Sequence, residues 1–278
     1  MVQHRNEYLA KAAEAAAYIA RSAGCEGFDT VVQCGSGLNG LIDAVLPDGG
    51  RIPMEDIPHF PASRVKGHGR EVIHGQVNGR NVMVLAGRIH LYEGHDPLTA
   101  GFPAALAHAS GARRFLLTNA AGGLNQHFVQ GSVMMITDFI NFQGDNALAH
   151  MLTDEAAQRF VDPKPATDLR QGQLLARQLQ KAGLKVNQGT YIGVRGPIYE
   201  TRAELAMMRS WGADAIGMST IPELTVCHAF GLPALGVSVI TNECFKDAPV
   251  THGEVVDIGS QVSPALGTAI RAFIEDLP

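Results

Sequence analysis

The spacing of hydrophobic and polar positions changes several times along this chain of 278 residues. Residues 7–22 carry apolar side chains at helical spacing, which predicts an amphipathic helix. Two apolar-rich runs, Glu71–Val77 and Arg80–Ala86, flank the dipeptide Asn78-Gly79, a strong short-range signal for a β-hairpin. The first part of the chain therefore predicts both a helix and paired strands.

Short apolar runs that end in polar or glycine-rich segments predict further buried strands. These runs are Thr30–Cys34, Arg114–Thr118, Ser132–Thr137 and Ala234–Thr241. Further helices are predicted for Leu169–Ala182, Thr201–Trp211, Ile221–Phe230 and the tail Glu254–Asp276. Alternating strands and helices predict an α/β fold in which helices flank a mixed central sheet. No linker or repeat divides the chain, so we expect one domain over residues 1–278.

The composition narrows the class of protein. The chain is 46% hydrophobic and 18% charged, so it can bury a sizeable core. A formal net charge of −5, without a basic run, argues against nucleic acid as a partner. No apolar run reaches the roughly 18–20 residues of a membrane span, and the first residues lack the apolar core of a signal peptide. Four cysteines without paired spacing predict free thiols and no metal site, so we expect a cytoplasmic protein with no membrane partner.

Three polar side chains, Glu200, Ser219 and Asn242, follow short apolar runs in the second half of the chain. Glu200 can accept a hydrogen bond from a ring N–H, and Tyr199 before it supplies an aromatic ring. Asn242 both donates and accepts, which suits the O6 and N7 atoms of a 6-oxopurine. The alternative is that Glu200 caps the following helix and Tyr199 belongs to the core. Asn242 is harder to explain structurally, because a buried carboxamide demands hydrogen-bond partners.

The segment Gly35-Ser36-Gly37-Leu38-Asn39-Gly40 matches the G-x-G-x-x-G pattern after a predicted strand. Read alone, it predicts a dinucleotide-binding unit in which Glu55 or Asp56 holds the ribose. A proline-rich loop and the hairpin follow it, however, in place of the helix and parallel strand that such a unit requires. Ser36 between two glycines therefore favours an anion-binding loop.

Other side chains in the sequence can donate hydrogen bonds to a bound oxyanion. Arg88 offers a planar fork of donors, and His90 falls on the same side of the chain if this segment is extended. Ser36 and Ser219 supply hydroxyl groups. The alternatives are a surface salt bridge for Arg88 and a structural role for His90. Together these residue types predict a phosphate pocket.

Six segments in order resemble the trimeric purine nucleoside phosphorylases. They are Gly35–Leu38, Gly87–Gly94, Thr118–Asn125, Gly196–Thr201, Gly217–Glu223 and Ile240–Asn242. The resemblance implies a partly barrel-like sheet and the reversible phosphorolysis of inosine, guanosine and their deoxy forms, a reaction of purine salvage. It also implies a homotrimer that uses inorganic phosphate as co-substrate, with no metal or organic cofactor.

The resemblance assigns roles to individual residues. It implies phosphate contacts from Ser36, His68, Arg88, His90, Ala120 and Ser219. It implies base contacts from Tyr199, Glu200 and Asn242, and sugar contacts from Tyr92, Met218, His252 and a neighbouring subunit's counterpart of Phe160. Among these, Asn242, Glu200, His90 and His252 are the expected catalytic residues, and Glu93 is expected to hold His90 or the phosphate. The alternatives for His252 and Phe160 are a solvated loop residue and an exposed aromatic.

Three residues depart from many relatives near the expected base site. Arg195, Tyr199 and Glu243 therefore bear on the preference among guanine, hypoxanthine and xanthine, and a xanthosine-preferring enzyme is one alternative. A methylthioadenosine phosphorylase is another, but it would carry an aspartate in place of Asn242 and no glutamate at position 200. A non-catalytic purine sensor is the alternative from a different class, and it would have no need of a phosphate pocket.

Overall fold

The computed structural model describes residues 3–61, 70–153, 160–246 and 251–278. The strands are β1 (Gln3–His4), β2 (Thr30–Gln33), β3 (Gly50–Pro53), β4 (Glu71–Val77), β5 (Arg80–Ala86), β6 (Arg114–Gly123), β7 (Val133–Phe142), β8 (Met151–Leu152), β9 (Val186–Val194), β10 (Ala215–Gly217) and β11 (Ala234–Glu243). The α-helices are α1 (Arg5–Ala23), α2 (Leu41–Val45), α3 (Pro97–Ala100), α4 (Phe102–Ala109), α5 (Leu169–Lys181), α6 (Arg202–Ser210), α7 (Ile221–Phe230) and α8 (His252–Glu275). Short 3₁₀ turns span Met54–Asp56, Leu91–Glu93 and Ala147–His150.

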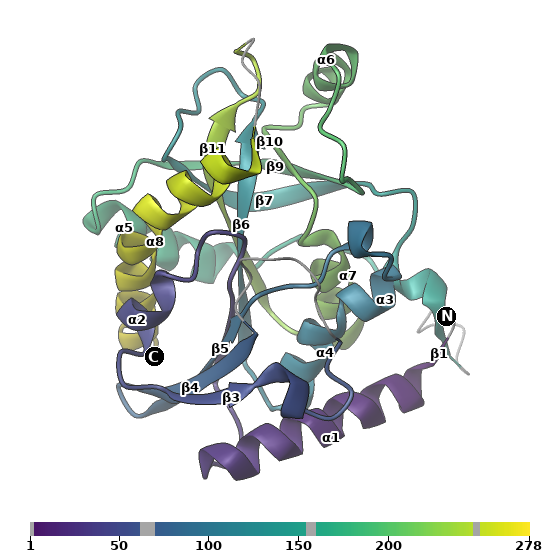
Figure 1. Ribbon diagram of the computed structural model, residues 1–278, viewed down its shortest axis with the longest axis vertical. Helices are drawn as coiled ribbons and strands as arrows, with labels where there is room; N and C mark the ends of the chain where they lie inside the picture. Colours follow the sequence, from purple (N-terminus) through teal and green to yellow (C-terminus); the bar gives the residue numbers. More distant parts are fainter. Residues whose placement is uncertain (1–2, 62–69, 154–159, 247–250) are drawn as a thin grey trace.

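One mixed sheet organises the described residues, with the strand order β10-β9-β7-β11-β6-β2-β5-β4-β3. β10 also pairs with β6, so β10, β9, β7, β11 and β6 close on themselves as a small barrel. The other strands continue from β6 as an open sheet, and helices lie on both sides of it (Figure 1). The predicted α/β fold with a partly barrel-like mixed sheet is therefore confirmed.

The core is divided by this sheet. α1, α4 and α7 pack on one another on one face, and α8 packs against α2 and α5 on the other (Figure 1). Val31 and Val32 of β2 are both fully buried, but they belong to different cores. Successive strand residues point to opposite faces, so a run of apolar residues is what a strand covered on both sides needs.

Most predicted elements are confirmed, and the three strands β6, β7 and β11 extend beyond the ends of their apolar runs. β4 and β5 have the predicted bounds, as does α7. β6 continues to Gly123 and β7 to Phe142, because their last residues pair with β11, β10 and β9. The pattern did not predict β9, whose first half is polar and contains Gly189.

The dinucleotide-binding alternative is wrong. The glycine loop after β2 leads into the five-residue helix α2, and β3 then runs antiparallel to β4 at the edge of the sheet. A parallel strand after a crossover helix is the feature that a dinucleotide unit requires. The glycine loop after β2 is therefore not part of a dinucleotide-binding unit.

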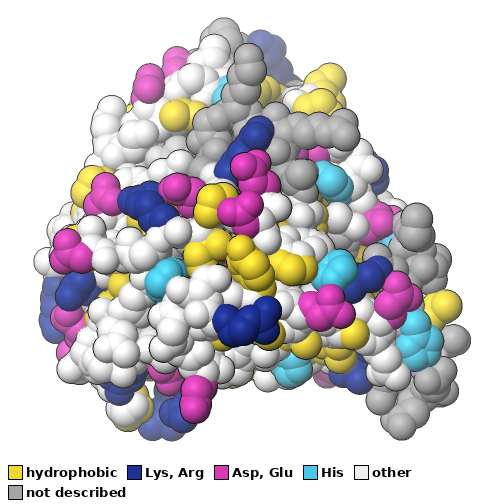
Figure 2. All heavy atoms as spheres, turned by 60° about the horizontal axis from the view of Figure 1, so that its bottom comes forward, with side chains coloured by type: hydrophobic (Ala, Val, Ile, Leu, Met, Phe, Trp, Pro, Cys, Tyr) yellow, Lys and Arg dark blue, Asp and Glu magenta, His cyan; other side chains and the backbone are white. Residues whose placement is uncertain are grey.

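The surface agrees with the charge balance of the sequence. Figure 2 shows a face on which acidic and basic side chains are interspersed among neutral atoms. Within the described ranges, no helix combines the length and apolar character needed to cross a membrane.

Candidate active site

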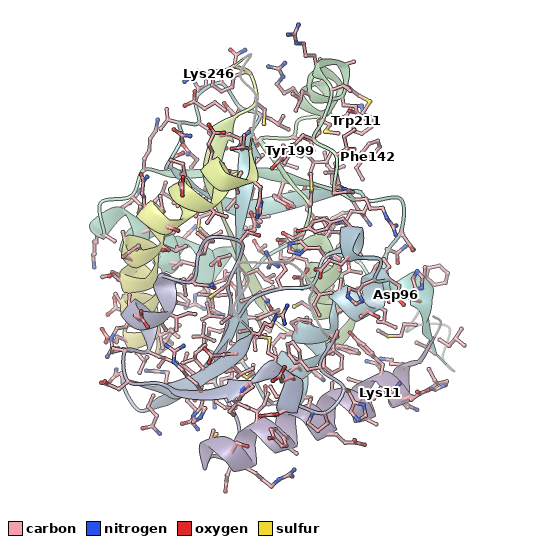
Figure 3. The ribbon with its side chains drawn as sticks, viewed as in Figure 1. Lys11, Asp96, Phe142, Tyr199, Trp211 and Lys246 are labelled. Atoms are coloured by element: carbon pink, nitrogen blue, oxygen red, sulfur yellow. The ribbon has the colours of Figure 1, made fainter. Side chains whose placement is uncertain are left out.

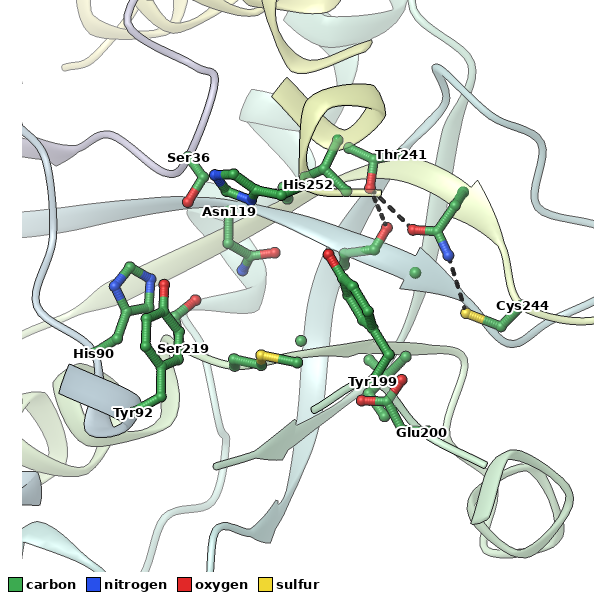
Figure 4. Close-up of a pocket in the computed structure, with 18 of the residues that line it drawn as sticks. Ser36, His90, Tyr92, Asn119, Tyr199, Glu200, Ser219, Thr241, Cys244 and His252 are labelled. Carbon is green, nitrogen blue, oxygen red and sulfur yellow. Dashed lines mark hydrogen bonds between the residues drawn. The ribbon is translucent and has the colours of Figure 1, made fainter. Parts of the chain in front are cut away.

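One pocket gathers nearly all the predicted site residues (Figure 4). It is lined by Ser36, Arg88, His90, Tyr92, Ala120, Tyr199, Glu200, Met218, Ser219, Asn242 and His252. Phe160 is 85% exposed and does not line this pocket, and His68 lies outside the described residues. The structure adds Asn119, Thr241 and Cys244 to the lining. Asn119 and Thr241 lie inside two of the six segments that carry the resemblance. A polar residue on a buried strand is the signal that could have identified each of them as a pocket residue.

The sheet topology explains why these residues meet. β5, β2, β6 and β11 are neighbouring parallel strands, so their carboxyl ends lie at the same edge of the sheet. Ser36 and Arg88 follow β2 and β5, whereas Ala120 and Asn242 lie near the ends of β6 and β11. Open α/β sheets bind ligands at this edge. Strand direction therefore brings these four residues together although they are far apart in the sequence.

The loop that carries Ser36 is held by close backbone contacts. A Cβ atom on Gly35 would lie 2.6 Å from the Cα of Asn119, so only glycine fits against β6. Gly37 has a φ of 74° and packs against the backbone of Val256 in α8. Glycine adopts this left-handed conformation without steric cost. The loop is thus wedged between β6 and α8, with Ser36 at the pocket.

Arg88 is buried and held in one orientation. Its Nε donates to Oε1 of Glu223 at 3.0 Å, and both side chains are 1% exposed. Its Nη1 donates to the carbonyl of Thr118 at 2.9 Å and to Oγ of Ser219 at 3.1 Å. Nη2 is buried and has no hydrogen-bond partner among the described residues. A fixed guanidinium with one unpaired terminal NH₂ group is a ready donor for an oxyanion. A surface salt bridge is excluded for Arg88, because both it and Glu223 are buried.

His90 is fixed by Glu93. The backbone N–H of His90 donates to Oε1 of Glu93 at 2.9 Å, and the ring Nδ1 lies 3.3 Å from the same oxygen. The ring also stacks on Tyr92, with centroids 4.6 Å apart and an interplanar angle of 15°. Burial lowers the pKa of His90 and outweighs the opposing effect of Glu93. The imidazole therefore stays neutral to lower pH than an exposed histidine.

A polar strand end and a strained turn complete this side of the pocket. Nδ2 of Asn119 donates to Oγ1 of Thr220 at 2.9 Å, and that hydroxyl lies 3.1 Å from Oγ of Ser219. Thr220 has a φ of 74°, which is unfavourable for a β-branched residue. Such strain is concentrated at functional sites. Here it places Ser219 beside Arg88, just before α7 begins.

Asn242 sits at an irregularity in β11. The register between β11 and β6 shifts between Ile240 and Asn242, so Thr241 is an extra residue in the ladder. The Thr241 hydroxyl lies 3.1 Å from Oδ1 of Asn242, and Nδ2 of Asn242 donates to Sγ of Cys244 at 3.4 Å (Figure 4). Bulges of this kind re-aim side chains next to active sites. The carboxamide therefore turns into the pocket with partners at both ends.

Glu200 does not cap α6. The N-cap is Thr201, which forms a capping box with Glu204, so the capping alternative for Glu200 is wrong. Burial and the nearby carboxylate of Glu204 raise the pKa of Glu200. Tyr199 is 44% exposed, so it is not a core aromatic. Both residues face the pocket (Figure 4).

An aromatic contact ties α6 to the sheet. Phe142 at the end of β7 and Trp211 after α6 form an edge-to-face pair with centroids 5.3 Å apart, and both are labelled in Figure 3. Glu243 accepts a hydrogen bond from the backbone N–H of Gln130 at 3.1 Å and pairs with Lys246. Glu243 does not line the pocket, whereas Tyr199 does.

Within the described ranges, no group of three His, Cys, Asp or Glu side chains is arranged to hold a metal ion. The arrangement offers a buried cation and hydroxyls on one side and a carboxamide and carboxyl on the other. In an α/β fold, this arrangement is typical of an enzyme site that is chemically suited to an oxyanion on one side and a planar heterocycle on the other.

Comparison with known proteins gives the family. Residues 29–275 match the model of the phosphorylase superfamily. Purine nucleoside phosphorylase 1 of Geobacillus stearothermophilus is 38% identical over 245 residues, which cover 87% of this chain and 89% of that protein. Purine nucleoside phosphorylase of Mus musculus is 37% identical over 256 residues, covering 89% of this chain and 88% of that protein.

Solved structures agree with the sequence relatives. A purine nucleoside phosphorylase of Schistosoma mansoni in complex with adenosine superimposes with a TM-score of 0.87 at 30% identity, covering 100% of this chain and 99% of that one. Isoform 2 from the same organism, in complex with cytosine and ribose-1-phosphate, gives 0.88 at 32% identity with the same coverage. The chain therefore belongs to the phosphorylase superfamily and, with these relatives, to the purine nucleoside phosphorylases, which are pentosyltransferases.

Proposed function

We propose that the protein cleaves inosine, guanosine and their deoxy forms with inorganic phosphate, giving a free 6-oxopurine and a pentose 1-phosphate. The observation that carries this proposal is the buried, unpaired Nη2 of Arg88 in the same pocket as the carboxamide of Asn242. A relative's complex with ribose-1-phosphate supports a pocket shared by sugar and phosphate. A purine sensor would have no use for this donor set, and Asn242 with Glu200 argues against a methylthioadenosine enzyme.

The phosphate would lie against Ser36, Arg88, His90, Ala120 and Ser219. Arg88 and the two serines supply fixed donors, and the neutral imidazole of His90 can donate without adding charge. Charge-assisted hydrogen bonds in a desolvated pocket are strong and need no reorganisation during the reaction. We also propose a phosphate contact from His68, which lies in the range 62–69 that the structure does not describe.

The purine would lie between Glu200 and Asn242, with Tyr199 against the ring. Glu200 accepts from N1–H, and Asn242 faces O6 and N7. Tyr92, Met218 and His252 would hold the sugar between the base and the phosphate. The reactants are then in line, which removes much of the entropic barrier.

The reaction transfers the pentose. The C1′–N9 bond breaks first, and its electron pair goes to the purine, which leaves an oxocarbenium-like sugar. A phosphate oxygen then forms the new bond to C1′, and the proton of hydrogen phosphate ends on the purine. A hydrogen bond from Asn242 to N7 strengthens as negative charge gathers on the base, while the bound phosphate stabilises the cation. This scheme uses phosphate as co-substrate and no resident cofactor.

The assay that tests the proposal measures base release from inosine, guanosine, xanthosine, adenosine and methylthioadenosine, with and without phosphate. Phosphate-dependent release of hypoxanthine and guanine is expected. Release without phosphate would indicate a hydrolase. No release of base from any of these nucleosides would favour the alternative of a non-catalytic purine sensor. Xanthosine as the best substrate would indicate that Tyr199 has changed the preference among 6-oxopurines.

The pH dependence of inosine cleavage tests the role of Glu200. Its carboxylate must be ionised to accept from N1–H, and burial raises its pKa. We therefore expect kcat/KM for inosine to fall on the acid side at a higher pH than an ordinary glutamate would give. Glu200→Gln is expected to lower kcat/KM for inosine and to remove the fall at acid pH that the carboxyl of Glu200 causes. The titration of phosphate itself affects the wild-type protein and the variant equally. An unchanged acid limb in the variant would assign it to another group.

We further propose that the active enzyme is a cytoplasmic homotrimer in which Phe160 completes the sugar site of a neighbouring subunit. Phe160 is 85% exposed, an unusual position for a large aromatic side chain in a lone chain. Phe160→Ala is expected to raise KM for inosine about tenfold, because burial of a phenyl ring is lost. Leu152→Ala, at a residue that is 47% exposed, is the matched control.

Mixed oligomers give the sharper version of this test. An Asn242→Ala subunit keeps Phe160, and a Phe160→Ala subunit keeps Asn242. Refolding the two variants together is expected to restore part of the activity, because one subunit supplies the ring that the other site lacks. No restoration in mixed oligomers whose mass shows both subunits would place Phe160 outside the site.

A further inference from the structure

Gln33 is a polar residue at the end of β2, the middle strand of three whose ends meet beside the pocket. It is paired with Leu85 of β5 on one side and with Leu117 of β6 on the other. Its side chain is fully buried. A fully buried glutamine is uncommon, so the hydrogen bonds of its amide need a reason.

The amide of Gln33 holds the chain just before Arg88. Its Nε2 donates to the carbonyl oxygen of Gly87. Gly87 has a φ of 135°, which favours glycine, and its N–H donates to the carbonyl of Leu85 at 3.0 Å. The carbonyl of Gly87 and the N–H of Arg88 belong to one planar peptide group. Gln33 therefore fixes the plane from which the chain continues into Arg88.

Thr118, on the other side of Gln33, connects the same strand end to the loop of Ser36. Its Oγ1 donates to the carbonyl of Gln33 at 2.8 Å and accepts from the N–H of Gly35 at 3.2 Å. The carbonyl of Thr118 accepts from Nη1 of Arg88 at 2.9 Å. Gly35 directly precedes Ser36. Thr118 therefore contacts both groups of donors that would face the phosphate.

These contacts form a closed ring across the three strand ends. From Gln33 the ring passes through Gly87 to Arg88. From Arg88 it returns to Gln33 through Thr118. Each hydrogen bond of the ring joins two different strand ends, so a shift of any one of them breaks a hydrogen bond. Arg88 and the loop of Ser36 are therefore held in one relative position before an anion arrives.

The other end of the Gln33 amide contributes nothing of this kind. Its Oε1 is buried and has no hydrogen-bond partner within the part of the chain that the structure describes. A buried acceptor without a partner lowers the stability of a protein, and an apolar side chain of the same length would avoid this loss. What the glutamine adds is therefore the orientation that Nε2 imposes on Gly87.

We propose that Gln33 and Thr118 are positioning residues for phosphate, which act through Arg88 and the loop of Ser36. Neither side chain is among the described residues that line the pocket. Donors that are fixed in advance bind an anion without the entropic cost of ordering them. The inference rests on the proposed function, because it assumes that the anion beside Arg88 is the phosphate that attacks the sugar.

The first experiment replaces Gln33 with methionine, which keeps the length of the side chain and removes the hydrogen bond to Gly87. KM for phosphate is expected to rise roughly threefold to tenfold. KM for inosine and kcat at saturating phosphate are expected to stay within about twofold of the wild-type values, because the base side of the pocket is unchanged. The measurement is steady-state hypoxanthine release with phosphate and inosine varied in turn.

The stability of Gln33→Met separates positioning from folding. The variant loses an unpaired buried oxygen, which favours the fold, and it leaves the carbonyl of Gly87 without this donor, which opposes it. The midpoint of urea unfolding is therefore expected to stay close to the wild-type value while KM for phosphate rises. A lower midpoint with a parallel rise in both KM values would show a purely structural role and overturn the inference.

The second experiment compares two replacements of Thr118. Thr118→Val removes the hydroxyl and keeps the shape, so KM for phosphate is expected to rise by a factor similar to that of Gln33→Met. Thr118→Ser keeps the hydroxyl, so KM for phosphate is expected to stay near the wild-type value. A rise of the same size in both variants would assign the effect to packing of the methyl group and overturn the role of this hydroxyl.

Thr30→Val is the matched control on the same strand. Thr30 is fully buried at the opposite end of β2, where its hydroxyl accepts from Nη1 of Arg114 at 3.0 Å. Its replacement is expected to lower the midpoint of urea unfolding and to leave KM for phosphate unchanged. If Thr30→Val raises KM for phosphate as much as Gln33→Met, any lost hydrogen bond in β2 has this effect and the inference is wrong.

The wild-type protein distinguishes the two levels of the argument. An active wild-type enzyme whose KM for phosphate is the same in Gln33→Met overturns the positioning role and leaves the proposed function intact. A wild-type protein without phosphate-dependent cleavage of any nucleoside overturns both.

Discussion

Replacing Asn242 with alanine is expected to lower kcat for inosine by about 10²- to 10³-fold. The physical reason is that the hydrogen bond to the purine strengthens as the departing base becomes negative, so its loss affects the transition state more than the bound substrate. Because the effect is on the transition state, KM is expected to change much less than kcat. The measurement is steady-state hypoxanthine release at saturating phosphate.

Asn187→Ala is a suitable control for this variant. Asn187 also carries a carboxamide on the barrel, where its Nδ2 donates to Oγ of Ser132 at 3.2 Å, but it does not line the pocket. Its replacement is expected to leave kcat close to the wild-type value. A near-native kcat in Asn242→Ala would contradict the proposed role, and a rise in KM alone would reduce it to ground-state binding.

Replacing Arg88 with methionine is expected to have two large effects that can be separated. Loss of the fixed guanidinium removes the main donor to phosphate, so kcat/KM for phosphate is expected to fall by about 10³-fold or more. The change also leaves the carboxylate of Glu223, which is 1% exposed, without its partner at 3.0 Å. An uncompensated buried charge of this kind lowers the free energy of unfolding by about 3–5 kcal/mol.

The double variant Arg88→Met with Glu223→Gln separates folding from binding. Removing both charges is expected to recover most of the free energy of unfolding, because replacing a buried ion pair by neutral groups is often close to neutral. Activity is expected to stay lost, because no donor to phosphate returns. The measurements are urea unfolding and phosphate-dependent base release. Recovery of activity along with stability would show that Arg88 acts only through the fold.

The sequence predicted the local elements where one physical signal dominated. The hairpin of β4 and β5 follows from Asn78-Gly79 between two apolar-rich runs, and α7 follows from its apolar run. β9 was missed because Asn187, Gln188 and Gly189 give its first half no strand pattern. Its pairing with β7 and β10 supplies the stability that its own residues do not signal.

The sequence predicted which residues line the candidate site, but not how their side chains are arranged. The motifs placed Ser36, Arg88 and Asn242 in one pocket, and the structure brings them together there. They included Glu223 in the segment Gly217–Glu223 but assigned it no role, and it orients Arg88 from 135 positions away in the chain. A contact at this sequence separation depends on how two parallel-strand ends and a helix meet, so no local pattern records it.

The sequence by itself determined the family of the protein, because the residue types and their order in six motifs resemble the purine nucleoside phosphorylases, and the relatives agree. The tertiary structure alone decided how the side chains of the pocket are arranged. Closure of five strands into a barrel, the extra residue Thr241 in β11 and the strained turn at Thr220 set the direction of each side chain. Side-chain direction depends on neighbours that are distant in the chain, and only folding brings those neighbours into contact.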